Sequence, residues 1–431
     1  MQIGLFLQLT LYAPVSLRGT SQALSLVFAC LFGPRFAIAC ANSGRLWLQR
    51  LGLYELTRPK EKADDWVWIV DHTIQISSVK CLLIVGCRLG VWQQKRQPLE
   101  HHDLQVLALE PVEKSSGEIV LQQLEETARI TGVPRAIVSD GGSDLTLGIS
   151  LFRQEHSRVA HCYDIAHKMA IFLKKILTND PRWRDFLKKM AQCKKQFVKS
   201  SLAFLTPPMV PDQARYMNLE GLLKWATRVR RFMDDPTAND GSLVEPWRVK
   251  LEFTWLREFD QPLAEWQELM QVVETTLHFV RWEGYHRDAH GELHARLLFH
   301  AEYPLSHQLC EQVVNFVAEQ SLAVAPGERL IGSSECIESL IGKGKRLEGQ
   351  QSRSGFTAMV LAIAAAVVKP TRQVIEAALA AVKTKDVATW AKRKLGLSVQ
   401  ARRHLAFQAA ANEPNAEQKP DNAHVAATPS F

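Results

Sequence analysis

The sequence predicts a mixed α/β protein with a large all-helical insertion. Five short apolar runs between positions 66 and 163 are separated by turn signals and helical segments, the pattern of a sheet flanked by helices. From 165 to 330 the apolar residues take helical spacing, and few strand-like runs remain. With 431 residues, 46% of them apolar, the chain can bury a sizeable core and is expected to form two or three domains.

The N-terminal region, residues 1–54, is expected to be helical. Two or three short helices fit 16–52, with a turn at Gly33-Pro34 and a last helix that carries Arg45 and Arg50. This pattern is similar to a helix-turn-helix segment that binds DNA, and a small helical cap on the core is the alternative. Residues 55–65 are polar and charged and are interpreted as a linker.

Two of the predicted strands end in an acidic residue: 66–71 ends in Asp71, and 136–140 ends in Asp140. The remaining elements up to position 163 are the strands 80–89, 104–113 and 158–163 and the helices 117–132 and 143–154. The order β-β-β-α-β-α-β-α is that of an RNase H-like fold with a mixed five-stranded sheet.

The predicted core is interrupted by the insertion. Its first part is 66–165, the helical insertion is 166–330, and its last part is 331–395. In that last part a helix starts after Gly332-Ser333-Ser334 and carries Glu335 and Glu338. Its basic end contains Lys343, Lys345 and Arg346. A buried helix at 356–368, a helix at 370–394 and a disordered tail at 409–431 complete the chain.

Charge and cysteine usage narrow the class of protein. The net charge of +7 fits a polyanionic partner, and residues 166–200 contain ten Lys and Arg against Asp180 and Asp185. The eight cysteines lack zinc-ligand spacing, which favours a reduced cytoplasmic compartment. The apolar stretch 22–41 is broken at Gly33-Pro34-Arg35, so no membrane span is expected.

The two strand-end acids and the helix-borne Glu338 form a candidate metal site. Phosphodiester chemistry needs a strong electrophilic field and an activated oxygen, which two Mg²⁺ ions roughly 3.5–4 Å apart supply. Mg²⁺ prefers carboxylate oxygens. Acids that end neighbouring strands are held at one edge of the sheet, and a third acid has to come from a helix packed across it. We therefore expect Asp71, Asp140 and Glu338 to converge.

Three segments resemble the acidic motifs of bacterial insertion-sequence transposases of the DDE type. They are Asp71-His-Thr, Ile137-Val-Ser-Asp140-Gly-Gly and Ser334-Glu-Cys-Ile-Glu338-Ser-Leu-Ile-Gly-Lys343-Gly-Lys345, and Tyr163-Asp164-Ile-Ala-His167-Lys168 is also similar. The resemblance covers roughly 60–370. The 198 positions from Asp140 to Glu338 (338 − 140) point to the groups with a helical insertion.

The resemblance implies an RNase H-like core, Mg²⁺ or Mn²⁺ (two ions), and cleavage and rejoining of DNA at transposon ends. Asp71, Asp140 and Glu338 would be the catalytic and metal-binding acids. The expected partner is double-stranded DNA, bound by a homodimer or higher oligomer in the cytoplasm, at the nucleoid. An inactive, transposase-derived DNA-binding protein and an RNase H-like nuclease are the alternative functions.

Further residues are candidates for the same site or for DNA contact. Glu335 lies one helical turn from Glu338, and Glu338 is preferred because Ile-Glu-Ser fits the motif better. His72 and His167 are possible accessory residues. The candidates for DNA contact are Arg45, Arg50, Lys168, Lys188, Lys189, Lys343, Lys345 and Arg346.

Overall fold

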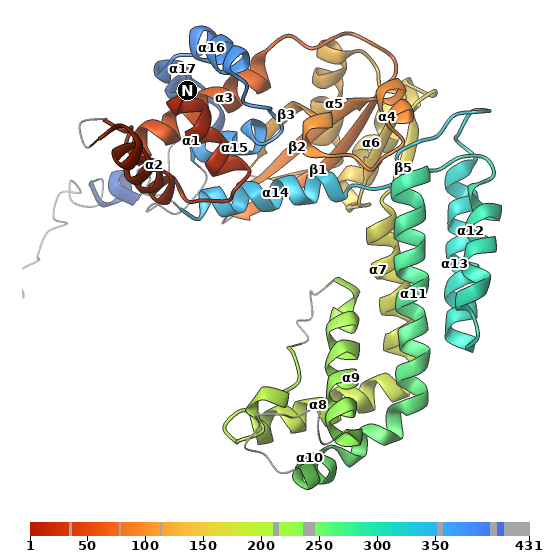
Figure 1. Ribbon diagram of the computed structural model, residues 1–431. Coiled ribbons are helices and arrows are strands. Elements are labelled where there is room, and N and C mark those ends of the chain that lie inside the picture. Colours follow the sequence, from red (N-terminus) through yellow and green to blue (C-terminus); the bar gives the residue numbers. More distant parts are fainter. Residues whose placement is uncertain are drawn as a thin grey trace, which may run out of the picture.

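The computed structural model describes residues 1–33, 37–76, 79–112, 114–209, 215–235, 246–350, 357–396 and 403–408. It shows an α/β body built on one mixed five-stranded sheet, from which a helical arm projects (Figure 1). Among the described helices, none combines the length and the apolar character that a membrane crossing requires.

The sheet has the strand order β3-β2-β1-β4-β5. β1 pairs antiparallel with β2, β2 pairs antiparallel with β3, and the β1–β4 and β4–β5 pairs are parallel. The central strands read as continuous apolar runs because helices cover both of their faces. The bounds are β1 Trp66–Ile76, β2 Val79–Arg88, β3 Gln105–Val112, β4 Ala136–Ser139 and β5 Ala160–Tyr163.

The first strand is longer than the sequence analysis predicts. β1 continues past Asp71 to Ile76 because β2 keeps pairing with it, whereas its pairing with the shorter β4 stops at Val70↔Ser139. Asp71 therefore does not end a strand. It lies where β1 loses its parallel neighbour, and Asp140 follows β4 directly.

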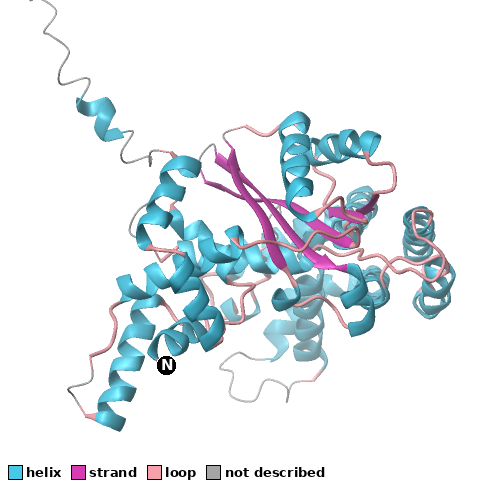
Figure 2. Ribbon diagram, turned by 90° about the horizontal axis from the view of Figure 1, so that it is seen from above, coloured by secondary structure: helices cyan, strands magenta, loops and turns pink. Residues whose placement is uncertain are grey.

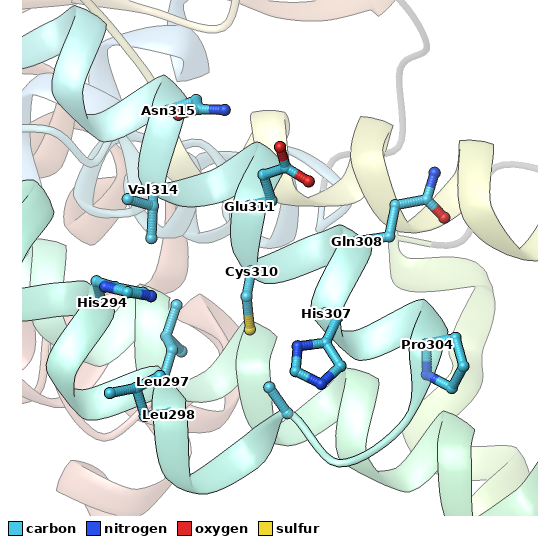
Figure 3. A pocket seen from close by; sticks show the side chains of 11 residues that line it. His294, Leu297, Leu298, Pro304, His307, Gln308, Cys310, Glu311, Val314 and Asn315 are labelled. Carbon is cyan, nitrogen blue, oxygen red and sulfur yellow. The ribbon is translucent and has the colours of Figure 1, made fainter.

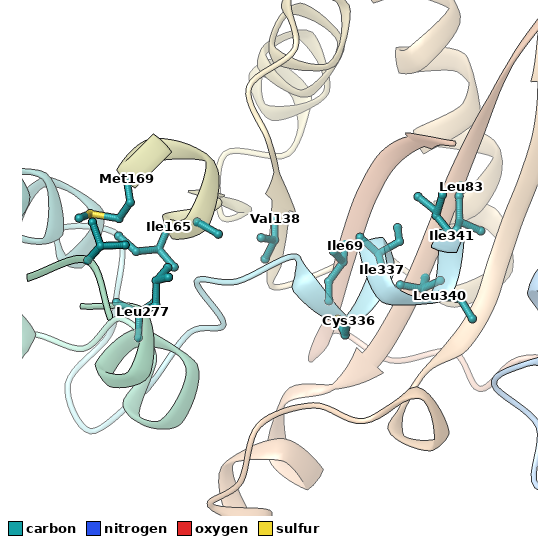
Figure 4. Close-up of a cluster of buried hydrophobic side chains, with 14 of the residues drawn as sticks. Ile69, Leu83, Val138, Ile165, Met169, Leu277, Cys336, Ile337, Leu340 and Ile341 are labelled. Carbon is teal, nitrogen blue, oxygen red and sulfur yellow. The ribbon is translucent and has the colours of Figure 1, made fainter. Parts of the chain in front are cut away.

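Helices cover both faces of the sheet (Figures 1 and 2). On one face, α5 (Gly117–Thr131) and α6 (Ser143–Glu155) bury their apolar sides against Trp68, Val70 and Ile84. On the other, α14 (Glu335–Glu348) crosses the sheet, and Ile337, Leu340 and Ile341 lie next to Ile69 and Leu83 (Figure 4). The short helix α4 (Leu89–Lys95) follows β2.

The N-terminal helices belong to the body. They are α1 (Gln2–Leu11), α2 (Leu17–Phe32) and α3 (Ala41–Thr57), and α1 precedes the short helices that were expected within 16–52. Helix α3 approaches α15 (Leu361–Ala365) so closely that a Cβ on Gly52 would lie 2.0 Å from the Leu361 carbonyl oxygen. With Leu48 and Leu51 fully buried as well, α3 contributes to the core of the body.

The expected linker at 55–65 is not a free segment. Helix α3 runs to Thr57, and the Lys60 ammonium lies 2.9 Å from the Glu55 carboxylate, with both side chains at most 5% exposed. A buried charge needs a partner of opposite sign, so this pair folds the segment back onto the end of α3. The Ala63 N–H adds a hydrogen bond to the Thr131 carbonyl.

The regular secondary structure among the described residues of 165–330 is helical, apart from an isolated bridge between Tyr285 and Leu330. Trp183, Trp225 and Trp266 form the arm's aromatic core, and the rings of Trp183 and Trp266 meet edge to face at 5.0 Å. The helices are α7 Ile165–Asn179, α8 Pro181–Phe197, α9 Leu219–Asp234, α10 Pro246–Phe253, α11 Asp260–Glu283, α12 Ala289–Leu297 and α13 Pro304–Ser321.

The C-terminal helix expected at 370–394 is two helices. α16 (Arg372–Ala381) and α17 (Thr384–Leu395) are separated at Val382 and Lys383, whose backbones are extended. The Lys383 N–H bonds to the Asp386 side chain, which starts the second helix separately. The predicted tail at 409–431 lies outside the described residues.

Candidate active site

Asp71 and Asp140 occupy neighbouring positions on one face of the sheet. Val70 pairs with Ser139, so the next residues along the two parallel strands, Asp71 and Asp140, come side by side. Side chains alternate along a strand. Asp71 therefore shares the face of Ile69, and Asp140 shares that of Val138, which is the face that α14 covers.

Glu338 belongs to the same electrostatic group. Burial, the largest cause, and the charge of Asp140 raise the pKa of Asp71 to about 7, and Glu338 and Asp164 add to the effect. A like charge acts in this way only at short range. Asp140 and Glu338 therefore lie close enough to Asp71 for their charges to raise its pKa.

Glu335 has a different partner. Its carboxylate forms an ion pair with Arg281 of α11, at the base of the arm. One turn of α14 separates it from Glu338, and the first turn of the helix holds both. The geometry thus assigns Glu335 to the contact with α11 and leaves Glu338 as the acid that influences Asp71.

The loop after Asp140 is packed against Tyr163 of β5. Gly141 has φ +81°, and a Cβ at this position would lie 2.2 Å from the Tyr163 ring. The pKa of Tyr163 is raised by burial and by the charges of Asp140 and Asp164. The Gly142 N–H donates to the Asp140 carboxylate at 3.0 Å, which orients the acid.

Asp164 is a fully buried carboxylate. It lies in one of the segments that resemble the transposase family, but the sequence analysis did not make it a candidate site residue. It is the N-cap of α7 and accepts the His167 N–H at 2.8 Å, and it also accepts the Ser334 N–H at 2.8 Å. The cap is readable in the sequence as Asp followed by a helix. The bond to Ser334 spans 170 positions and has no local signal.

The two accessory histidines are placed differently. His72 follows Asp71 on β1, and alternation sends its ring to the opposite face, where Nε2 lies 3.1 Å from the Ser115 hydroxyl and Nδ1 lies 3.7 Å from the Asp144 carboxylate. It therefore lies across the sheet from the acids. His167 lies in the first turn of α7, with its ring 6.0 Å from that of Tyr163.

Three of the predicted DNA contacts have partners within the protein. The Arg50 guanidinium donates to the Leu379 and Val382 carbonyls, so it satisfies the carboxyl end of α16 rather than facing a ligand. The Lys168 ammonium lies 5.1–5.3 Å from the ring centres of Tyr163, Phe172 and Phe316. Arg45 donates to the side chain of Asn42 on the same helix.

The other predicted DNA contacts are at least partly exposed, although Lys189 also has an acidic neighbour. Lys188 is exposed on α8, and Lys189 lies 3.8 Å from Glu258 with 42% of its side chain exposed. Lys345 and Arg346 are exposed on α14, whereas Lys343 is half-buried. Burial and Arg346 lower the pKa of Lys343.

The cavities of the arm are separate from the acids. A groove of about 520 Å³ runs between α12 and α13 and is lined by His294, Leu297, Cys310 and Val314 (Figure 3). A second cavity, of about 530 Å³, lies beside α8 and includes Lys188 and Lys189. None of the three acids lines either cavity.

Within the described ranges, no group of three or more His, Cys, Asp or Glu side chains is arranged to hold a metal ion. The charges of Asp140 and Glu338 raise the pKa of Asp71, but the three acids do not form a closed ligand set. No model of a known protein family matches this chain, and no curated protein matches it. The fold and the site thus define a mixed α/β protein with acidic side chains grouped on one face of its sheet.

Proposed function

We propose that this chain is a DNA transposase of the DDE type, in which Asp71, Asp140 and Glu338 carry metal-dependent strand cleavage and strand transfer. The observation behind the proposal is the electrostatic grouping of these acids on the α14 face of the sheet. They are 267 positions apart from first to last (338 − 71), and each belongs to one of the three acidic motifs of the sequence.

The topology supports an RNase H-like core for this activity. Three antiparallel strands followed by two parallel ones, in the order β3-β2-β1-β4-β5, match the element order expected for that fold. The chain leaves this core after β5 and returns before α14, so the helical arm is an insertion between the second and third acids.

The donor set fits a hard divalent cation. Asp71, Asp140 and Glu338 offer carboxylate oxygens, which Mg²⁺ and Mn²⁺ favour. The raised pKa of Asp71 reflects negative charge gathered in a partly desolvated place, which a cation would relieve. When bound, two such ions supply Lewis-acid activation and neutralise charge at the phosphate.

The chain's own residues contribute positioning. Asp71 lies on the paired strand β1 and Asp140 directly follows β4, and the Gly142 N–H holds one carboxylate oxygen of Asp140. Glu338 comes from a helix that is anchored by Ile337 and Leu340, both fully buried. A rigid frame of this kind holds charged groups in place before substrate arrives, which is where much of the rate enhancement of phosphoryl transfer arises.

DNA would approach along the basic surfaces. Helix α8 presents exposed Lys188 on the arm, and α14 presents exposed Lys345 and Arg346 on the body. Phosphate contacts of this type supply affinity that does not depend on sequence. A homodimer or higher oligomer on DNA is part of the proposal, as is the location at the nucleoid.

The test uses a linear DNA fragment that carries the sequences flanking this chain's gene, with Mg²⁺ or Mn²⁺. Asp71→Asn, Asp140→Asn and Glu338→Gln should each lower strand cleavage by at least about 1,000-fold, because each removes a charge that holds the metal. DNA binding, measured without metal, should stay within a few-fold of wild type.

Glu335→Gln is the matched control. It removes a carboxylate from the same turn of α14, and its partner Arg281 is 36% exposed, so the lost ion pair should cost about 0–1 kcal/mol of stability. Cleavage should persist within a few-fold. Equal cleavage by the three variants and the wild type would refute the proposal. Cutting without joining would instead indicate a nuclease, and binding without cutting an inactive derivative.

A further inference from the structure

The chain enters and leaves the arm side by side, where Asp164 and Ser334 meet. Helix α7 leaves the body immediately after Asp164, and the chain returns at Gly332 and Ser334. We infer that Asp164 is a positioning residue that holds the helix of Glu338 in register with the strand of Asp140. This inference rests on the proposed function, because it concerns the same carboxylate site.

Three hydrogen bonds of Asp164 carry the argument. Its N–H donates to the Ser139 carbonyl at 2.9 Å, one residue before Asp140. Its Oδ1 accepts the N–H of Ser334, the N-cap of α14, at 2.8 Å. Its Oδ2 accepts the N–H of His167 at 2.8 Å. One buried residue thus bonds to the strand end before one acid and to the helix start before another.

Asp164 is connected to Glu338 through Ser334 and the first turn of α14. The Ser334 carbonyl accepts the N–H groups of Ile337 and Glu338, so the first turn of α14 is built directly on the residue that Asp164 holds. A shift of Ser334 would move Glu338 with it. Since metal ligands need placement within a fraction of an ångström, such a shift would weaken the site without unfolding the protein.

Other hydrogen bonds also join the segment that enters the arm, after Asp164, to the segment that leaves it, before Ser334. The Ile165 N–H donates to the Gly332 carbonyl at 2.9 Å, and the Tyr285 hydroxyl donates to the Tyr163 carbonyl at 3.0 Å. Tyr285 also exchanges two backbone hydrogen bonds with Leu330. These bonds join the two segments that connect the arm to the body. The bonds of Asp164 differ because they reach both the strand before Asp140 and the helix of Glu338.

The hydrogen bonds of the Asp164 carboxylate indicate a different role from that of Asp71, Asp140 and Glu338. Each of its oxygens accepts a backbone N–H, whereas the carboxylate of Asp140 accepts one such bond, from Gly142. Asp164 is also fully buried, while Asp71, Asp140 and Glu338 are only partly buried. It is therefore placed to orient metal ligands rather than to be one of them.

Asp164→Asn isolates the bond to Ser334. Asn caps a helix about as well as Asp, so its amide oxygen can keep the bond to the His167 N–H. The amide NH₂ then faces the Ser334 N–H, and two donors cannot bond. Asp164→Ser is the second variant: its single oxygen also caps α7 and leaves the Ser334 N–H without the acceptor.

The matched control is Asp180→Asn. Asp180 is likewise a buried N-cap aspartate of the arm, and it accepts the Arg182 N–H at 2.9 Å at the start of α8. This variant measures how much stability is lost when a helix-capping carboxylate of the arm is changed to an amide. Because its carboxylate bonds to Arg182 and Trp266, which both lie in the arm, the substitution should leave metal binding unchanged.

The measurements are Mn²⁺ affinity by calorimetry on the full chain without DNA, and kcat and KM for cleavage of the gene-flanking fragment. Asp164→Asn and Asp164→Ser should weaken Mn²⁺ binding and lower kcat by roughly 10–100-fold, with KM for DNA unchanged. Asp180→Asn should match wild type in both. Wild-type Mn²⁺ affinity in both Asp164 variants, or an equal loss in Asp180→Asn, would overturn the inference.

The two proposals fail in different ways. If the wild type binds Mn²⁺ and the Asp164 variants lose affinity, but no DNA is cut, the positioning role stands and the transposase assignment falls. If cleavage is normal in the Asp164 variants, the assignment stands and the positioning role falls. A wild-type chain that binds no Mn²⁺ overturns both.

Discussion

Gly141 illustrates how one residue without a side chain shapes the site. It follows Asp140, has φ +81°, and lies against the ring of Tyr163. An alanine here would have to adopt a backbone conformation that L-residues avoid, and its Cβ would overlap the ring. The glycine thus permits the chain to turn sharply at the acid while β5 remains packed against the loop.

We therefore expect Gly141→Ala to lower the free energy of unfolding by about 1–3 kcal/mol, as measured by chemical denaturation. It should also reduce cleavage, because the Asp140 loop must shift. Gly142→Ala is the control: its φ is −51°, and an added Cβ would meet its nearest neighbour at 3.4 Å. Similar losses in the two variants would contradict the role assigned to Gly141.

At the scale of elements, α8 combines a structural face with a basic face. Trp183, Phe186 and Met190 are buried in the aromatic core of the arm, while Lys188 is exposed and Lys189 is partly exposed. Helical periodicity separates the two sets, because residues three and four apart share a face. The basic face can therefore be altered without touching the core.

Lys188→Ala combined with Lys189→Ala should weaken DNA binding and flatten its salt dependence. Each lost phosphate contact should make the slope of log K against log salt shallower by roughly 0.9. Arg372→Ala combined with Lys385→Ala removes two exposed charges from α16 and α17 of the body and should leave the slope unchanged. An unchanged slope in the α8 variant would remove this face from the DNA-binding surface.

At the scale of the whole molecule, the charge of one partly buried carboxylate links stability to pH. The folded state raises the pKa of Asp71 from 3.8 to about 7, so folding favours its protonated form. The resulting stabilisation is present in full below the ordinary pKa and is lost as pH rises through about 7. A bound metal acts in the opposite direction, because it needs the ionised carboxylate.

Calorimetric unfolding of wild type and Asp71→Asn tests this linkage. In EDTA the unfolding temperature of wild type should fall relative to the variant between about pH 4 and 8, because asparagine remains uncharged throughout. Saturating Mg²⁺ at about pH 8 should reverse the order by stabilising only wild type. If the difference between the two proteins does not change with pH in EDTA, Asp71 does not titrate in this range.

Local signals in the sequence determined most elements of the α/β body. Apolar runs bounded by turn residues predict the strands near 80–89, 104–113 and 136–140, and helical spacing that stops at Gly132 predicts α5. These signals work because burial on a sheet face and helix termination depend on neighbouring residues. The prediction of a single helix at 370–394 was wrong, because no glycine or proline marks the break at Val382–Lys383 in the sequence.

Only the tertiary structure decided which polar groups meet. It pairs Glu335 with Arg281, groups Glu338 with Asp71, turns Arg50 toward the end of α16, and joins Asp164 to Ser334. These partners lie 54 to 329 positions apart along the chain. The sequence by itself could propose the three acids as candidates, because motifs are local. It could not assign their partners, because ion pairs and hydrogen bonds depend on the packing of distant elements.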